Sequence, residues 1–187
     1  MAQTPSNMVA LGTIAQDFAL PEPLTGKTIS LKQFVQGKPF VLMFICNHCP
    51  FVKHVNAALV KLANEYIPRG ISFIAISSND AGAYPEDGPE KMKEYARKLN
   101  YPFPYLYDES QEIARLYEAA CTPDFYIFNE ESALVYRGQL DDSRPSNGVE
   151  VTGKDIRNAL NNLLTGNPVS KIQLPSIGCN IKWKKDL

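Results

Sequence analysis

The chain alternates between short, fully apolar runs and longer segments that carry one apolar stripe. The runs at 40–45 and 71–76 are apolar throughout, as strands covered by helices on both faces are. Apolar residues recur every three to four positions over 50–66, 89–99 and 155–164, which predicts three helices. Strands and helices therefore alternate through the middle of the chain.

Two pairs of short runs predict antiparallel hairpins. The first pair lies at 17–20 and 28–31, separated by residues rich in proline and glycine. The second pair lies at 125–128 and 134–137, on either side of a polar turn. Alternation followed by an antiparallel pair predicts an α/β fold: a mixed central β-sheet flanked by helices on both faces, with an N-terminal β-hairpin.

The length of 187 residues fits one domain, 1–187, with a substantial buried core. Residues 1–15 have no clear pattern, and we expect them to be frayed. The tail at 167–187 also has no clear period. It contains Cys179 and Trp183, however, so we expect the tail to pack on the domain.

Composition excludes several classes of function. The formal net charge is −1, and this balance favours neither nucleic acid nor a polyanionic partner. No apolar stretch approaches the roughly 20 residues of a membrane helix, and the first fifteen residues lack the pattern of an export signal. We therefore expect a cytoplasmic protein.

The motif Cys46-Asn47-His48-Cys49-Pro50 lies where the strand at 40–45 gives way to a helix. Unpaired N–H groups and the helix dipole favour a thiolate at such a position. Four cysteines are too few for a disulfide-built scaffold, so C-x-x-C spacing indicates redox or metal chemistry. His48 either stabilises the thiolate or acts as a base, or else it is an ordinary surface histidine.

Together with Cys121-Thr122-Pro123 before the strand at 125–128, this arrangement resembles the thioredoxin fold, in which a cis-proline loop lies against the active-site sulfur. The extra N-terminal strands and an insertion near 80–108 resemble the redoxins, which include the alkyl hydroperoxide reductase and thiol-specific antioxidant class. The likeness extends over about 12–184 and is strongest to the peroxiredoxin-like branch. Three further motifs carry it: Tyr84-Pro85-Glu86-Asp87, Arg137-Gly138-Gln139-Leu140-Asp141-Asp142 and Ile177-Gly178-Cys179.

The resemblance implies Cys49 as the nucleophile, because the peroxidatic cysteine of the T-x-x-C-P pattern precedes a proline. Cys46 occupies the threonine position of that pattern and is the first candidate for the resolving thiol, with Cys179 the second. Pro50, Thr122 and Pro123 are the implied supporting residues, together with His48. Cys121 is either a third redox thiol or a small apolar core residue.

We therefore expect a thiol–disulfide oxidoreductase without a cofactor, with the Cys49 sulfur ionised and open to solvent. The expected substrate is a protein disulfide or a peroxide, and the reductant is a thioredoxin or a small thiol. A thiol-dependent peroxidase is one alternative, although the missing threonine weakens it. A metal-binding or carrier protein using Cys46, Cys49, Cys121 and a histidine is another. The acidic pair Glu86 and Asp87 is interpreted as the solvated start of a helix.

Overall fold

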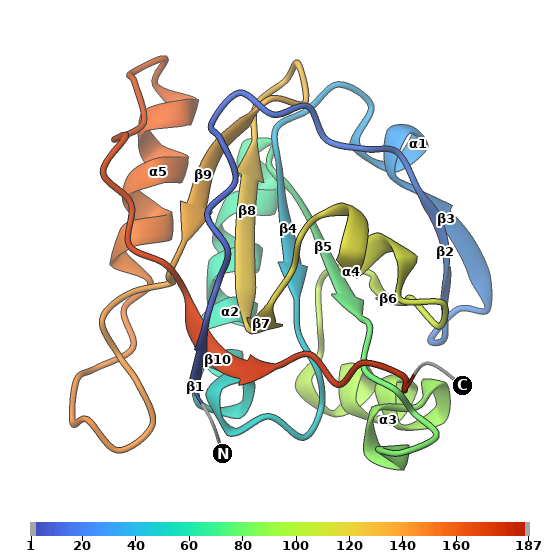
Figure 1. Cartoon of the computed structure of the whole chain (residues 1–187). Helices are drawn as coiled ribbons and strands as arrows, with labels where there is room; N and C mark the ends of the chain where they lie inside the picture. Colours follow the sequence, from blue (N-terminus) through green and yellow to red (C-terminus); the bar gives the residue numbers. More distant parts are fainter. Residues whose placement is uncertain (1–2, 186–187) are drawn as a thin grey trace.

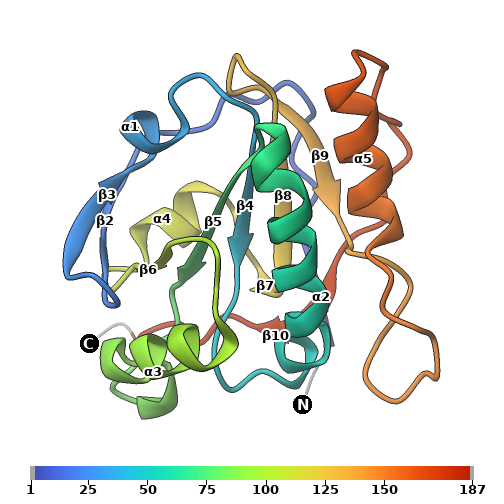
Figure 2. The same cartoon turned by 180° about the vertical axis from the view of Figure 1, so that it is seen from behind.

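The computed structural model describes residues 3–185, and its centre is a five-stranded sheet with helices on both faces (Figure 1 and Figure 2). β4 (Phe40–Phe44) runs parallel to β5 (Ser72–Ser77) and antiparallel to β8 (Asp124–Phe128), so the predicted mixed-direction α/β sheet is confirmed. Across the sheet the strands are β6 (Tyr105–Tyr107), β5, β4, β8 and β9 (Leu134–Gly138).

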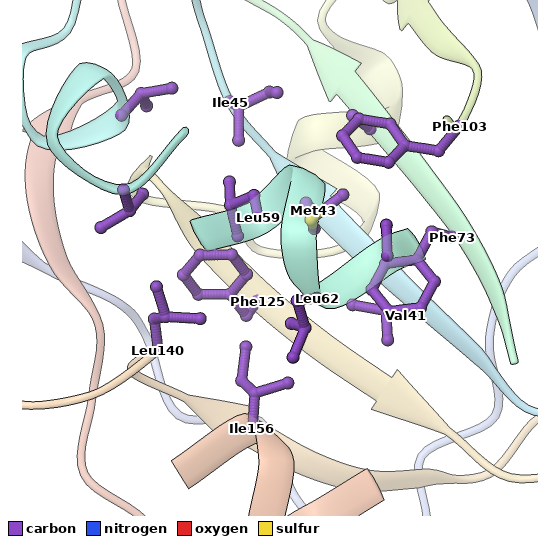
Figure 3. Packing of buried hydrophobic residues seen from close by; sticks show 14 of the residues in the cluster. Val41, Met43, Ile45, Leu59, Leu62, Phe73, Phe103, Phe125, Leu140 and Ile156 are labelled. Carbon is purple, nitrogen blue, oxygen red and sulfur yellow. The ribbon is translucent and has the colours of Figure 1, made fainter. Parts of the chain in front are cut away.

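One face of the sheet packs against the long helices. Val41, Met43 and the following Ile45 point to this face, because alternate side chains of a strand lie on one side. Figure 3 shows them beside Leu59 of the central helix and Phe125 of β8. The helices here are α2 (Pro50–Tyr66), α3 (Pro89–Leu99) and α5 (Lys154–Leu164), all three as predicted.

The opposite face carries a second apolar core. Phe40, Leu42 and Phe44, the other half of β4, point into it. The predicted N-terminal hairpin lies on this side and is confirmed, since its two strands pair antiparallel. The elements here are β2 (Ala19–Glu22), β3 (Lys27–Ser30), α1 (Leu31–Val35) and α4 (Glu112–Leu116).

A second, three-stranded sheet joins both ends of the chain to the region of the motif. Its order is β1 (Gln3–Pro5), β10 (Ile177–Asn180) and β7 (Cys121–Thr122), all antiparallel. The expectation that residues 1–15 are frayed is therefore wrong for the described part, which begins at Gln3. Residues 1–2 lie outside the described range. The tail packs on the domain through β10.

The local patterns missed a few short elements. The described part of the chain also forms the 3-10 turns η1 (Ile67–Arg69) and η2 (Pro85–Asp87), as well as the three-residue strand β6. β6 carries only Tyr105, Leu106 and Tyr107, too few residues to show a period. Among residues 3–185, no helix combines the length and the hydropathy needed to cross a membrane.

Candidate active site

The first turn of α2 places the C-x-x-C motif. β4 ends at Phe44, and the chain then crosses the edge of the sheet to Cys49, the N-cap residue of α2. Cys49 has extended backbone angles, φ −63° and ψ 123°, and its carbonyl accepts the first helical hydrogen bond from Lys53 N at 3.0 Å. Pro50 follows at the first helical position, where its missing N–H would have had no partner. The Cys49 sulfur therefore lies at the positive end of a 17-residue helix.

Both motif thiols are buried. The exposed fraction is 0% for Cys49 and 2% for Cys46. The expectation that the Cys49 sulfur is open to solvent is therefore wrong. The cover comes from β10, which packs against α2 and places Cys179 beside Cys49. The sequence predicted that the tail packs on the domain and offered Cys179 as a resolving thiol, but it did not show that the tail covers the Cys49 sulfur.

The surroundings of Cys49 favour its ionised form. A hydrogen bond from the Cys46 thiol is the largest cause, and together with donors from Cys179, the Val52 backbone and Thr122 it lowers the pKa of Cys49 to about 5 despite burial. The Thr122 carbonyl oxygen lies 3.1 Å from the Cys49 Sγ and accepts a hydrogen bond only from the protonated thiol. That carbonyl opposes ionisation, but the donors outweigh it.

The surroundings of Cys46, in contrast, favour its protonated form. Its hydrogen bond to Cys49, its burial and the negative charge of Asp87 raise the pKa of Cys46 well above the ordinary thiol value. Its Sγ also lies 3.4 Å from the Thr122 Oγ1. The pair therefore consists of one thiolate and one protonated thiol that donates to it.

The Thr122–Pro123 peptide bond is cis and lies against the motif. Thr122 belongs to β7, and its side chain turns toward Cys46. Cys121, the neighbouring residue of the strand, turns to the other side, where its Sγ lies 3.6 Å from the Pro123 carbonyl oxygen. Burial raises the pKa of the Cys121 thiol, followed by the charge of Asp124. Cys121 is thus a protonated core thiol.

His48 is held by a buried carboxylate. Its Nδ1 lies 2.5 Å from the Oδ2 of Asp87, and its ring stacks on Tyr84 with centroids 5.3 Å apart. Asp87 also accepts hydrogen bonds from the backbone N–H groups of Asn47 and His48 and from the Asn79 side chain. The interpretation of Asp87 as a solvated helix start is wrong, since its exposed fraction is 0%. The only signal in the sequence was its place in the Tyr84-Pro85-Glu86-Asp87 motif.

The predicted metal-ligand set is not brought together. Among residues 3–185, the group of potential ligand atoms within 4.8 Å of one another comes from Cys46, His48 and Asp87, without Cys49 or Cys121. The oxygens of Asp87 already accept N–H groups, which a metal ion would have to displace. The geometry therefore suits a dithiol with an adjacent His–Asp pair better than a metal centre.

Arg137 and the second histidine form their hydrogen bonds with groups other than the motif thiols. Arg137 is buried, and its Nη2 donates to the Asp124 Oδ2 at 3.2 Å and to the Glu118 carbonyl oxygen at 2.8 Å. Burial raises the pKa of Asp124 to about 6 despite this ion pair. The second histidine, His54, lies 2.7 Å from the Ser143 hydroxyl. These contacts tie Arg137 of β9 to Asp124 of β8 and to Glu118, and neither of them involves the Cys49 sulfur.

A cysteine at a strand-to-helix turn, facing a cis-proline loop on a mixed sheet, defines a thioredoxin-like redoxin. The model of the AhpC/TSA family matches residues 11–137, more than half of the chain. The protein therefore belongs to the AhpC/TSA family. The comparison with curated proteins gave no match.

Solved structures agree with this assignment. An uncharacterized conserved protein from Geobacillus kaustophilus is 59% identical, with a TM-score of 0.97, and the match covers 100% of this chain and 99% of that one. A hypothetical protein from Sinorhizobium meliloti 1021 is 46% identical, with a TM-score of 0.95 and coverage of 98% and 100%. A peroxidoxin from Mycobacterium tuberculosis shares the fold alone, at 16% identity, a TM-score of 0.61 and coverage of 83% and 96%.

Proposed function

We propose that the protein is a thiol–disulfide oxidoreductase in which Cys49 is the nucleophile and Cys46 resolves the intermediate. The observation that carries the proposal is that both motif sulfurs contact Thr122 at the N-terminus of α2, where the pKa of Cys49 is lowered and that of Cys46 is raised. The thiolate is the reactive form of cysteine, and at neutral pH Cys49 alone of the pair has it.

The reaction is a two-step exchange. The Cys49 thiolate attacks one sulfur of a disulfide, forming a mixed disulfide and releasing the other sulfur as a thiolate. Cys46 then loses its proton and attacks the Cys49 sulfur, which releases the second substrate thiolate and leaves a Cys46–Cys49 disulfide. Two electrons pass to the substrate. A thioredoxin or a small thiol restores the dithiol, as a reducing compartment such as the cytoplasm allows.

The His48–Asp87 pair is the proposed acceptor for the Cys46 proton. A ring nitrogen of His48, a carboxylate oxygen of Asp87 and the Cys46 sulfur all lie within 4.8 Å of one another. Asp87 holds the imidazole through Nδ1, which leaves Nε2 as the other nitrogen that can carry a proton. The side chain of His48 is 17% exposed, so the proton has a path to solvent.

Peroxide is the second candidate oxidant, and the burial of Cys49 favours it. A protein disulfide reaches a sulfur with an exposed fraction of 0% only after the segment around β10 moves, whereas hydrogen peroxide is little larger than water. In that case the thiolate attacks a peroxide oxygen, leaving a sulfenic acid and an alcohol or water. Cys46 converts the sulfenic acid to the same disulfide with loss of water.

Stopped-flow oxidation distinguishes the two substrates. The reduced protein is mixed with hydrogen peroxide, oxidised glutathione or a peptide disulfide, and the loss of titratable thiols is followed. We expect two thiols to be lost per chain, Cys49→Ser to abolish the reaction and the matched control Cys121→Ser to leave it unchanged. Faster reaction with disulfides supports the first proposal, and faster reaction with peroxide supports the second. An unchanged rate in Cys49→Ser contradicts both.

A further inference from the structure

We propose that Cys179, carried to the site by β10, is a second resolving thiol for Cys49. The inference rests on the proposed function, because it requires Cys49 to be oxidised. It assigns two mutually exclusive disulfides to one nucleophile: Cys46–Cys49 within the motif, and Cys49–Cys179 between the N-terminus of α2 and β10.

Strand pairing brings Cys179 to the motif. β10 pairs antiparallel with β7, and Cys179 lies opposite Thr122 in the register. The carbonyl of Thr122 is itself 3.1 Å from the Cys49 Sγ. On its other side β10 pairs with β1, where Gln3 lies opposite Cys179. Cys179 is 2% exposed and belongs to the same apolar core as both motif cysteines.

Gly178 makes this close approach possible. A Cβ atom at this position would lie 2.0 Å from the Thr122 carbonyl oxygen and 3.1 Å from the Pro123 nitrogen. Gly178 does not have a positive φ, so the glycine is needed for space and not for backbone conformation. The absence of a side chain therefore lets β10 press against the cis-proline loop, which places the next residue, Cys179, beside Cys49.

The chemical state of Cys179 suits a resolving thiol. It forms a side-chain hydrogen bond with Cys49, and burial together with that bond raises the pKa of Cys179 to about 12. A protonated thiol that donates to the nucleophile lies on the side from which it would attack that sulfur. Cys121 has a raised pKa as well, but its sulfur turns toward the Pro123 carbonyl, which makes it a matched control.

The proposed step balances with a peroxide as the oxidant. The Cys49 thiolate takes one oxygen from the peroxide and becomes a sulfenic acid. The Cys179 sulfur attacks the Cys49 sulfur, the S–O bond breaks, and the hydroxide leaves with the thiol proton as water. The product is a Cys49–Cys179 disulfide, which covers the nucleophile against further oxidation when Cys46 is not available.

Tryptic peptides distinguish the two proposed disulfides. Cleavage after lysine and arginine, except before proline, leaves Cys46 and Cys49 together on peptide 33–53, Cys179 on 172–182 and Cys121 on 116–137. A Cys46–Cys49 bond therefore stays within one peptide, whereas a Cys49–Cys179 bond joins two. The reduced full-length protein receives one equivalent of hydrogen peroxide, is treated with dimedone to trap sulfenic acid, and is then digested and mapped by mass spectrometry.

The variant Cys46→Ser is the main test, with Cys46→Ala as a second variant in case the serine form does not fold. We expect peptides 33–53 and 172–182 to be cross-linked, with almost complete loss of the dimedone adduct on Cys49. In Cys46→Ser/Cys179→Ser we expect the adduct to return and the cross-link to disappear. In Cys46→Ser/Cys121→Ser we expect the cross-link to persist.

A stable dimedone adduct on Cys49 in the Cys46 variants, with the Cys179 thiol intact, overturns the inference and leaves the proposed function standing. A cross-link from 33–53 to 116–137 overturns it too, since it gives the resolving step to Cys121. If Cys49 is not oxidised in any variant, by hydrogen peroxide or by oxidised glutathione, the proposed function itself fails.

Discussion

The ionisation of Cys49 gives the sharpest quantitative test. With a pKa of about 5, roughly three quarters of Cys49 is thiolate at pH 5.5, against about 0.03% for a thiol at the ordinary value of 9.0. Nucleophilicity falls with pKa by a Brønsted coefficient of about 0.4–0.5, which over four pKa units costs about 40- to 100-fold. We therefore expect Cys49 to react with iodoacetamide about 20- to 60-fold faster than an equally accessible ordinary thiol at pH 5.5.

The perturbation that tests the cause is Cys46→Ala. It removes the Cys46 hydrogen bond, the largest cause of the lowered Cys49 pKa. A hydrogen bond to a charged group contributes about 1.5–3 kcal/mol, which corresponds to about one to two pKa units. The midpoint of the pH profile should therefore rise by about one to two units, and the reactivity above that midpoint should exceed that of the wild type.

Two assays measure this midpoint. Ultraviolet absorbance of the thiolate is independent of access to the buried sulfur, and the pH dependence of alkylation measures reactivity. The other three cysteines have raised pKa values, so the wild type should show one thiolate transition between pH 4 and pH 7. Cys49→Ser should lose it and Cys121→Ser should keep it. A wild-type midpoint above pH 8 contradicts the ionisation of Cys49 at neutral pH. A midpoint that Cys46→Ala leaves unchanged excludes the Cys46 hydrogen bond as the cause of the lowered pKa.

Three further outcomes follow from individual contacts. Gly178→Ala should raise the Cys49 midpoint. The added Cβ must move about 1 Å or more away from the Thr122 carbonyl, and this movement of β10 weakens the hydrogen bond from Cys179 to Cys49. An unchanged absorbance titration contradicts this prediction. Asp87→Asn should destabilise the fold by about 1–3 kcal/mol in urea denaturation, because buried N–H groups lose their charged acceptor. Leu59→Ala, in the core shown in Figure 3, should cost about 2–5 kcal/mol in the same assay without moving the Cys49 midpoint.

The parts of the fold that could be predicted are those set by local periodicity. The central strand and α2 carry long apolar patterns, and the Cys-x-x-Cys motif at their junction fixed the position of the candidate site. The short strands β1, β7 and β10 could not be predicted, because the strands that they pair with are distant in the sequence. Gln3 pairs with Cys179, and no window of the chain contains both residues. Such pairing is a property of the completed fold.

The sequence predicted which residues form the candidate site, but it did not predict how deeply they are buried. Cys46, Cys49, Thr122 and Pro123 lie together, as the resemblance implied. Two features depended on tertiary packing: the burial of the Cys49 sulfur and the burial of Asp87. An acidic residue before a helix is usually solvated, and only the N–H groups that converge on Asp87 explain why this one is not.

The same packing gives the site an unusual electrostatic arrangement. The main causes of the low Cys49 pKa are neutral hydrogen-bond donors, and two of these donors are thiols. The groups that keep Cys49 ionised are therefore the groups that we propose to resolve its oxidised form. Once either thiol forms a disulfide with Cys49, its S–H donor is lost. Alkylation of either Cys46 or Cys179 in the reduced protein should therefore raise the Cys49 midpoint and slow the reaction of Cys49 at pH values below that midpoint.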